Sequence, residues 1–395
     1  MPVFLSDSDD EKRPFAGGLL TPVWRFLGSF DYLQIAGALV LMAFGVVFVR
    51  STGIQTDHPG NWLRHMAWIG FGGGLFFIMS YFDYRYLKVL SPLIYAVGIF
   101  LLVAVLFSPP INNARSWLAI PGVGLRIQPS EAGKIGTIIA VSALMVRPGF
   151  DIRNFWHMWV PVLVALLPML LILIEPDFGS AFVLVPVIAF MMFAAGMRKR
   201  WALIAVLAAV IFIPLLVLNE VYEIYPLLKP YQRTRITTFL DPNIDPHGAG
   251  YNLRQARLAV GSGGWNGKGI GQGTLSGLGY LPQTVTNNDF IFSVIAEETG
   301  FVGVALLLLA EMVLVFSCLR IALMTEDLFG RYIAVGMAAL LFSHSYINIG
   351  MCIGLAPISG LPLPLVSFGG SFMATNLGML GILQSIYRYR KEVEA

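Results

Sequence analysis

The sequence predicts an all-α polytopic membrane protein, and three observations support this fold class. Hydrophobic residues make up 56% of the 395 residues and charged residues only 12%, whereas a soluble globular protein carries about 25% charged residues. Apolar stretches long enough to cross a hydrocarbon layer about 30 Å thick recur along the chain. The basic residues gather in alternate short loops between these stretches. The net charge of +3 and the absence of a basic run argue against nucleic-acid binding.

Ten stretches have the length and composition of a membrane-spanning helix. In chain order they cover residues 32–49, 66–82, 89–107, 128–146, 158–174, 179–197, 201–219, 300–319, 332–354 and 369–387. We expect a membrane domain over residues 32–387, with tails at 1–31 and 388–395. About thirty polar or mixed residues precede the first stretch and no cleavage site follows it, so we do not interpret it as a signal peptide.

The Lys and Arg residues predict the orientation of these helices. With a cytoplasmic N-terminus, the cytoplasmic segments hold fifteen Lys and Arg residues and the short outer loops hold four. Basic residues favour the cytoplasmic side of short loops. Ten spans also return the basic C-terminal tail to the cytoplasm. We therefore expect both termini inside.

Residues 220–288 form one long extracytoplasmic loop between the seventh and eighth predicted helices. The stretch "YNLRQARLAV" has helical spacing, with Leu253, Ala256 and Val260 on one side, and it predicts an amphipathic helix at the interface. The stretch "GSGGWNGKGIGQG" lacks the glycine and the Ser or Thr of a phosphate-binding loop, since Ser262 and Gly269 occupy those positions. We expect no nucleotide there, and instead a loop packed closely on other backbone or on a sugar-phosphate ligand.

Glu131 and Lys134 open the fourth predicted helix in "QPSEAGKI". Their spacing of three places both charges on one helix face, although charges inside a membrane are costly. One interpretation is a salt bridge with Lys134 reaching out to the interface. The other, which we favour, is a polar cavity that holds an anionic headgroup and is continuous with Asp289.

Two further stretches lie at the outer ends of predicted helices. In "EPDFGSA", Asp177 suits a helix cap, and a direct catalytic role for Glu175 or Asp177 is the less favoured alternative. In "LPLPLVSFGGSF", Ser367 and the N–H groups of the next helix either hold phosphate oxygens or only shape the turn. The residues themselves leave both alternatives open.

Asp289 lies where the long loop re-enters the membrane, in "TNNDFIFSVIAEETG". As a helix cap it would be ordinary, but Thr286, Asn287 and Asn288 already offer capping side chains. A carboxylate held beside apolar groups has a tunable pKa, which suits a general base. Asp289 is therefore the candidate catalytic residue.

In order along nearly the whole chain, the stretches "QPSEAGK", "EPDFGSA", "FLDPNIDPHGAGYNLRQARLAVGSGGWNGKG", "YLPQTVTNNDFIFSVIAEETGFVG" and "GLPLPLVSFGGS" resemble the SEDS family of shape, elongation, division and sporulation proteins. The "GYN" and "GKG…GT" forms are more similar to its RodA branch than to its FtsW branch. The sequence departs from the family pattern at Asn287-Asn288, where His-Thr is usual. It also departs at Glu175, where Gln is usual, and at Gln283, where Glu is usual.

The resemblance implies a peptidoglycan glycosyltransferase that polymerises lipid II at the outer face of the bacterial cytoplasmic membrane, for elongation and cell shape. It implies that Asp289 is the catalytic residue and that Glu131 and Lys134 line the central cavity. The reaction would invert the anomeric carbon and release undecaprenyl diphosphate. We expect Lys134, Arg115 or Arg235 to hold the diphosphate, with a divalent metal, Mg²⁺ or Mn²⁺, as a possible cofactor that Asp289 would then bind.

By the same resemblance, the expected protein partner is a class B penicillin-binding protein that supplies transpeptidation. Two other classes of function stay open. A lipid II flippase would use the charged cavity as a pathway, but the sequence shows no clear internal repeat of the kind found in many transporters. A non-catalytic scaffold of the cell-wall machinery would leave Glu131, Lys134 and Asp289 without a role.

Overall fold

The computed structural model describes residues 29–54, 60–110, 115–119, 126–225, 227–246, 248–277 and 286–390, and long helices dominate it. The long helices are α2 (Tyr32–Ile54), α3 (Asn61–Tyr81), α4 (Tyr86–Val105), α5 (Pro129–Met145), α6 (Phe155–Ile174), α7 (Phe178–Ala194), α8 (Lys199–Val221), α13 (Ile291–Met324), α14 (Leu328–Ile353) and α15 (Gly370–Tyr389). Each predicted span overlaps one of them. Among the described residues, six helices are long and apolar enough to cross a membrane, namely α2, α4, α6, α8, α13 and α14, and α7 is apolar but shorter.

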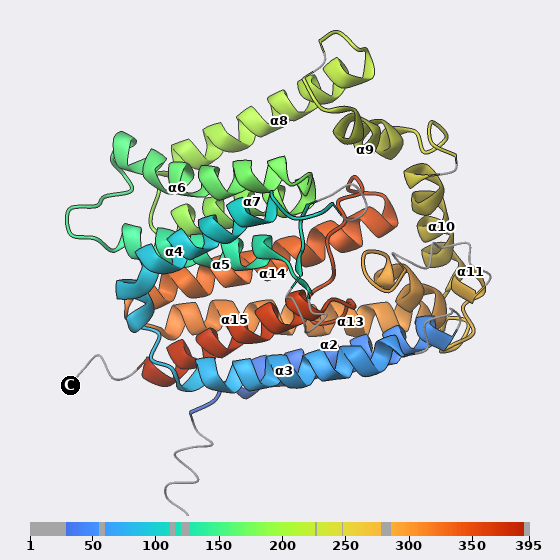
Figure 1. Cartoon of the computed structure of the whole chain (residues 1–395), viewed down its shortest axis with the longest axis horizontal. Coiled ribbons are helices and arrows are strands. Elements are labelled where there is room, and N and C mark those ends of the chain that lie inside the picture. Colours follow the sequence, from blue (N-terminus) through green and yellow to red (C-terminus); the bar gives the residue numbers. More distant parts are fainter. Residues whose placement is uncertain are drawn as a thin grey trace, which may run out of the picture.

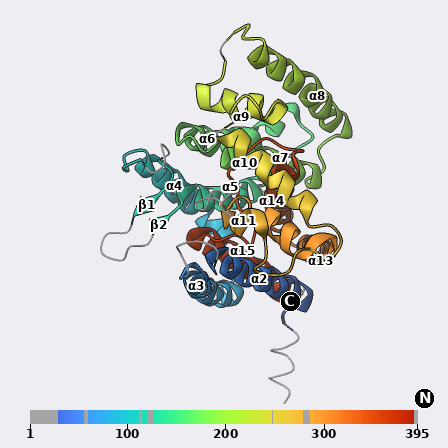
Figure 2. The same cartoon turned by 90° about the vertical axis from the view of Figure 1, so that its right-hand side faces the viewer.

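Buried helices carry the polar residues of the bundle, and lipid-exposed helices are apolar all round. In α14, 72% of the most apolar window is buried, and its buried residues include Ser343, His344 and Asn348. In α8 none of the corresponding window is buried, and this helix lies at the rim of the bundle (Figures 1 and 2). Since lipid offers polar groups no hydrogen bonds, they are kept where other helices can supply them.

The elements of the long loop gather at one end of the bundle, and the C-terminal end of α15 lies at the other (Figure 1). They are α9 (Pro230–Leu240), α10 (Ala249–Ser262) and α11 (Thr274–Gly277), and Figure 2 looks onto this end. A short antiparallel pair, β1 (Leu118–Ala119) and β2 (Arg126–Ile127), precedes α5. We call this end of the bundle the loop end.

The amphipathic helix predicted in the long loop is α10. Leu253 and Ala256 are fully buried, as predicted, and Val260 is half-buried. This helix packs against α13 and α14, and its placement at the membrane interface stays a prediction. The buried face of α10 is therefore covered by protein.

The glycine-rich stretch packs on the backbone of α13, at a kink centred on Gly300 (φ +64°). The Phe301 N–H donates to the Gly264 carbonyl at 2.8 Å and the Val302 N–H donates to the Trp265 carbonyl at 3.2 Å. A Cβ atom on Gly300 would lie 2.4 Å from the Gly267 nitrogen. Of the two alternatives for this stretch, close packing on backbone is the one that the structure supports. The predicted span began at Gly300, whereas α13 begins at Ile291, before the kink.

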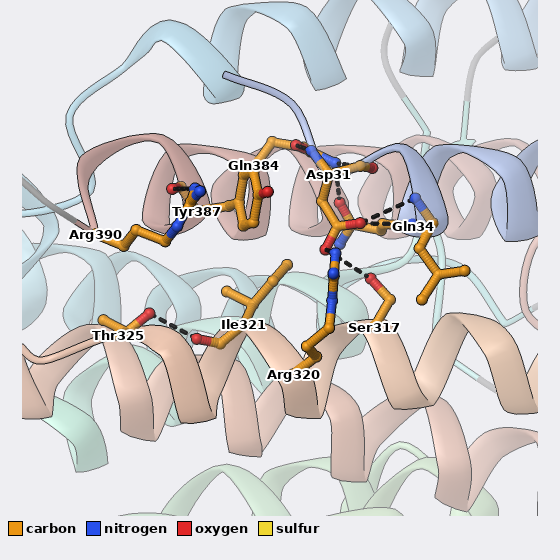
Figure 3. Close-up of polar contacts among 10 residues, drawn as sticks. Asp31, Gln34, Ser317, Arg320, Ile321, Thr325, Gln384, Tyr387 and Arg390 are labelled. Carbon is orange, nitrogen blue, oxygen red and sulfur yellow. Dashed lines mark hydrogen bonds and ion pairs between the residues drawn. The ribbon is translucent and has the colours of Figure 1, made fainter. Parts of the chain in front are cut away.

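A polar cluster ties three helices together at the end opposite the loop end (Figure 3). The Asp31 carboxylate, before α2, accepts from Arg320 of α13 at 2.5 Å. Gln384 of α15 donates its amide to the Asp31 carbonyl at 3.1 Å and to the Gln34 side chain at 2.5 Å. The cluster thus joins α2, α13 and α15. Most of the predicted tails, residues 1–28 and 391–395, lies outside the described residues.

Candidate active site

The backbone just before α13 is held at three consecutive residues. The carbonyl oxygens of residues 287–289 accept hydrogen bonds from the Phe368 N–H at 2.9 Å, the Ser367 hydroxyl at 2.6 Å and the Asn348 amide at 2.8 Å, in that order. Asn348 is fully buried and also donates to the Leu361 carbonyl at 2.6 Å. The turn that precedes α15 and a buried amide of α14 therefore fix the position of Asp289.

The Asp289 side chain is left available. It is half-buried, and no described residue donates a hydrogen bond to its carboxylate. The N-cap of α13 is Phe290, without a side-chain capping bond, so the alternative that Asp289 is only a helix cap is wrong. A Cβ atom on Gly360 would lie 3.6 Å from Asp289 Oδ2. The carboxylate therefore lies close to the backbone of Gly360, where the absence of a side chain leaves space next to the carboxylate.

Two charges act on the Asp289 carboxylate. Burial raises its pKa to about 6, the positive charge of Arg235 opposes this rise, and the negative charge of Asp177 adds to it. Arg235, on α9, donates to the Ser359 carbonyl at 3.3 Å, next to Gly360. A carboxylate with a pKa near neutrality is suited to accept a proton. The structure thus brings the predicted residues Asp289 and Arg235 together.

Asp177 caps α7, as predicted, and is also a charged member of the site. Its Oδ1 accepts from the Ser180 N–H at 3.1 Å, and its Oδ2 accepts from the Gln128 amide at 3.1 Å. The neighbouring Glu175 is fully buried, and neither carboxylate oxygen has a hydrogen-bond partner among the described residues. Burial and the Asp177 charge raise the pKa of Glu175 to about 8, so this side chain is neutral at pH 7.

Glu131 and Lys134 form a buried ion pair, with Lys134 Nζ 2.8 Å from Glu131 Oε1. Lys134 Nζ also lies 2.9 Å from Nε2 of His344 on α14. Lys134 is fully buried, so the interpretation that it reaches out to the interface is wrong. Pairing removes the cost of an isolated charge in the membrane, about 2.5–3.5 kcal/mol on insertion scales.

A small cavity beside the pair is lined by Glu131, His344 and other side chains of α5, α14 and α15, and Asp289 does not line this cavity. Asp177 is a neighbour of both places, because its charge acts on Asp289 and on Glu131. A polar cavity that continues from the pair to Asp289 stays a prediction.

Two predicted substrate-binding residues have other contacts. Ser367 is buried, and its hydroxyl donates to the Asn288 carbonyl and accepts from the Leu363 N–H at 2.7 Å. This hydroxyl is used within the chain, which corrects the prediction that it holds phosphate. Arg115 is exposed and donates to the Leu106 carbonyl at 2.7 Å, so its contacts join it to the end of α4 and not to Asp289.

The acids that follow Asp289 hold the long loop in place. Glu297 Oε1 accepts from Lys268 Nζ at 2.6 Å. Glu298 accepts from the Ser51 hydroxyl at 2.6 Å and from the Gly271 N–H at 3.0 Å. Both carboxylates are buried, so their role in the structure is to attach the loop to α13.

Two residues of the site, His344 and Asn348, were not identified from the sequence, and neither was the electrostatic role of Asp177 beside its role as a cap. His344 and Asn348 are four apart, on one face of an apolar helix. That polar spacing was a usable signal, but only the packing of α14 on α5 shows that His344 meets Lys134. Gln283, one of the departures from the family pattern, lies outside the described residues.

The donor set around Asp289 does not by itself form a metal site. Among the described residues, no three His, Cys, Asp or Glu side chains gather closely enough to hold a metal ion. Mg²⁺ prefers an octahedron of oxygen ligands, several of them water or substrate phosphate. The protein groups at hand, Asp289 and Asp177, would have to be completed by such ligands.

Known proteins resemble this chain over most of its length. A family model described as "Cell cycle protein", for FtsW, RodA and SpoVE, matches residues 31–392. Peptidoglycan glycosyltransferase MrdB of Escherichia coli K12 is 35% identical over 354 residues, which cover 89% of this chain and 92% of MrdB. Stage V sporulation protein E of Bacillus subtilis is 35% identical over 376 residues, which cover 92% and 98%.

Solved structures also resemble this chain over most of its length. A chain from a peptidoglycan synthase complex that coordinates polymerization and crosslinking has a TM-score of 0.77 and 31% identity, over 92% of this chain and 99% of that one. Rod shape determining protein RodA of Thermus thermophilus has a TM-score of 0.67 and 26% identity, over 92% and 98%. The motifs, the family model and the shared fold lead to one conclusion: this chain belongs to the FtsW/RodA/SpoVE family, the SEDS family that its motifs resemble.

Proposed function

We propose that this protein is a peptidoglycan glycosyltransferase that polymerises lipid II. The observation that carries the proposal is the hydrogen bonding of Asp289. Its backbone is fixed by three hydrogen bonds, while its half-buried carboxylate has no hydrogen-bond donor among the described residues and lies near Arg235. A helix cap would have its carboxylate bonded. Relatives named peptidoglycan glycosyltransferases support the reaction class.

In the proposed reaction, the Asp289 carboxylate accepts the proton of the acceptor sugar hydroxyl. The hydroxyl oxygen then attacks the anomeric carbon of the donor sugar and inverts it. The bond from that carbon to the diphosphate breaks, and undecaprenyl diphosphate leaves with the electron pair. Arg235, whose positive charge acts on Asp289, would neutralise part of the negative charge of this leaving group. The acid has to be ionised to act, so the reaction needs a pH above its pKa.

Glu131, Lys134 and His344 have a supporting role in this proposal. Two of the three hydrogen-bonding positions of the Lys134 ammonium are taken by Glu131 and His344, and all three side chains are buried. Direct contact between lipid II and Lys134 would need this cluster to open. We infer that the cluster fixes α5 against α14 and, through Asp177, contributes to the charge at Asp289.

A divalent cation, Mg²⁺ or Mn²⁺, stays a prediction. Asp289 and Asp177 would bind it together with oxygens of the lipid diphosphate, and the cation would supply further neutralisation of the leaving group. A chelator titration in the polymerisation assay tests this. Full activity at saturating chelator would remove the cation from the proposal.

We propose ten transmembrane helices, with both termini in the cytoplasm and residues 220–288 outside, in the bacterial cytoplasmic membrane. The fifteen-to-four bias of Lys and Arg supports this topology, as does the position of the C-terminal end of α15 opposite the loop end (Figure 1). Ser262 is exposed on the long loop, whereas the native Cys318 and Cys352 are buried. A Ser262→Cys variant should react with a membrane-impermeant thiol reagent added outside cells. Labelling only after cell lysis would contradict the topology.

We also propose that the chain works with a class B penicillin-binding protein and serves elongation. The similarity to a chain of a peptidoglycan synthase complex supports a partner, and the similarity to MrdB and RodA proteins supports the elongation branch. Relatives named FtsW are 32–34% identical, so identity alone does not separate the branches. Depletion of the protein should give round cells if it serves elongation and filaments if it serves division.

The decisive experiment is polymerisation of labelled lipid II by the purified full chain in detergent, followed by gel separation of the glycan. Long glycan chains from the wild type and none from Asp289→Asn would support the proposal. Transfer of lipid II between leaflets of a liposome without polymer would instead favour the flippase.

A further inference from the structure

An apolar groove runs between α2, α3 and α15 on the side of the bundle. Its cavity volume is about 190 Å³, and nearly all of its lining is apolar. Gly73 of α3 lies in its wall, and a Cβ atom added there would meet no other atom within 4 Å. The groove is therefore open where a side chain would otherwise fill it.

A cation lies at one end of this groove. Arg388, in the last turn of α15, has its guanidinium carbon 4.0 Å from the ring centre of Tyr81 and 5.0 Å from that of Phe30. Tyr81 ends α3, and Phe30 lies two residues before the start of α2. The cation is thus held by the ends of the same three helices that form the groove. Since Tyr81 follows Phe77 of the groove by four residues, the two are about 6 Å apart along the helix.

Two nitrogens of this guanidinium, Nε and Nη2, are buried and have no hydrogen-bond partner among the described residues. The acids on the same elements are engaged elsewhere. Asp31 is paired with Arg320 at 2.5 Å, and Asp83 lies 4.0 Å from Arg85. Aromatic rings stabilise the cation but accept no strong hydrogen bond from it. An anion that binds here therefore meets an Arg388 side chain that no described acid neutralises.

Gln34 lines the groove, but its amide is engaged within the chain. Its Oε1 accepts from Gln384 (Figure 3), and its side chain also forms a hydrogen bond with Cys318 of α13. Gln34 therefore adds no free donor to the groove.

We propose that this groove binds one anionic phospholipid. The phosphate would lie at Arg388, and an acyl chain would run past Gly73. The order of these two features along the helices, a cation and then an apolar wall, matches the order of phosphate and acyl chain in a phospholipid. The site is at the end opposite the loop end, which the proposed topology puts in the anionic cytoplasmic leaflet.

The experiment is native mass spectrometry of the full chain in detergent, with phosphatidylglycerol and phosphatidylcholine as competing probes. Wild type should retain phosphatidylglycerol preferentially. Arg388→Gln should weaken this binding about fivefold, since one basic residue near an anionic headgroup contributes about 1 kcal/mol. Gly73→Leu should weaken binding of both lipids, because the new side chain fills the space of the acyl chain.

Two matched variants serve as controls. Gly74→Leu adds the same side chain one position away, at an exposed glycine that does not line the groove. Arg147→Gln removes an exposed arginine that no groove residue contacts, after α5. Both should retain the lipid as wild type does. Thermal stability of each variant in detergent shows that it is folded.

Three outcomes would overturn the proposal. Gly73→Leu could bind phosphatidylglycerol as well as wild type does, which would mean that no chain lies in the groove. Arg388→Gln could keep the wild-type preference between the two lipids. Inorganic phosphate could displace phosphatidylglycerol, which would mean that the cation takes free phosphate and not a lipid. None of these readouts depends on glycosyltransferase activity.

Discussion

Two acidic positions within ten residues of the chain have opposite environments. Glu298 is buried with its oxygens bonded to Ser51 and Gly271. Asp289, at the start of the same segment, has its backbone bonded and its carboxylate unbonded among the described residues. The difference indicates which acid can react. A carboxylate whose oxygens already accept hydrogen bonds stabilises the fold. A carboxylate with a fixed backbone and no hydrogen bonds to its oxygens is available to accept a proton from a substrate.

The largest expected effect is that of Asp289→Asn on catalysis. The amide has nearly the same shape but accepts no proton, and general base catalysis contributes roughly 10²–10⁴-fold. We expect lipid II polymerisation to fall by at least that factor, with thermal stability in detergent unchanged. Asp151→Asn, an exposed aspartate far from Asp289 in sequence, is the control and should be fully active. Near-normal polymerisation by the Asp289 variant would reopen the flippase alternative.

Asn348→Leu should have the next largest effect. It removes the donor to the Asp289 and Leu361 carbonyls, so the carboxylate loses one of its fixed points. A displacement of about 1 Å can cost 10²-fold in rate, and we expect a loss of about that size in kcat with little change in KM for lipid II. Ser343→Ala, which removes a buried hydroxyl without a described partner on the same helix, should be close to wild type. A raised KM with normal kcat would argue against a positioning role.

Glu298→Gln should act on stability and not on chemistry. The variant leaves buried donors at Ser51 or Gly271 less well satisfied, a cost of about 1–3 kcal/mol. We expect a lower unfolding temperature and faster hydrogen exchange over residues 264–275, with activity that follows the folded fraction. Glu326→Gln, at an exposed glutamate, should change neither quantity. Complete loss of activity in a stable Glu298→Gln protein would mean that Glu298, like Asp289, takes part in the reaction. The contrast between the two acids would then be wrong.

The smallest expected effect is a shift in the pH profile. Burial raises the Asp289 pKa to about 6, so activity should fall as the pH drops through about 6 and the base becomes protonated. Arg235 lowers this pKa and Asp177 raises it. Arg235→Gln should therefore move the acidic limb to higher pH, and Asp177→Asn, which still caps α7, should move it to lower pH.

Arg233→Gln is the control for the pH experiment. Arg233 is on the same helix as Arg235, but its partner is Glu223. Its profile should coincide with that of wild type. Equal shifts for Arg233→Gln and Arg235→Gln would mean that the acidic limb of the pH profile depends on the total charge of α9 and not on Arg235 in particular.

The sequence by itself determined the fold class, the approximate helix positions and the catalytic candidate. Apolar length and the scarcity of charge are properties of single segments, since each helix satisfies its own backbone in lipid. The Asp177 cap and the helix of residues 249–262 were predictable for the same reason. Asp289 was conspicuous because a charge at a membrane boundary needs an explanation.

Only the tertiary structure decided which polar groups meet. That Lys134 is buried against His344, that Asn348 holds the Asp289 backbone and that Ser367 is engaged within the chain all depend on contacts between residues 59 to 210 positions apart. Periodicity predicted the buried face of α10, but only the packing of the bundle shows that α13 and α14 cover this face. Side-chain periodicity shows which face of a helix is buried, but the identity of the atoms that cover it is set by helix packing.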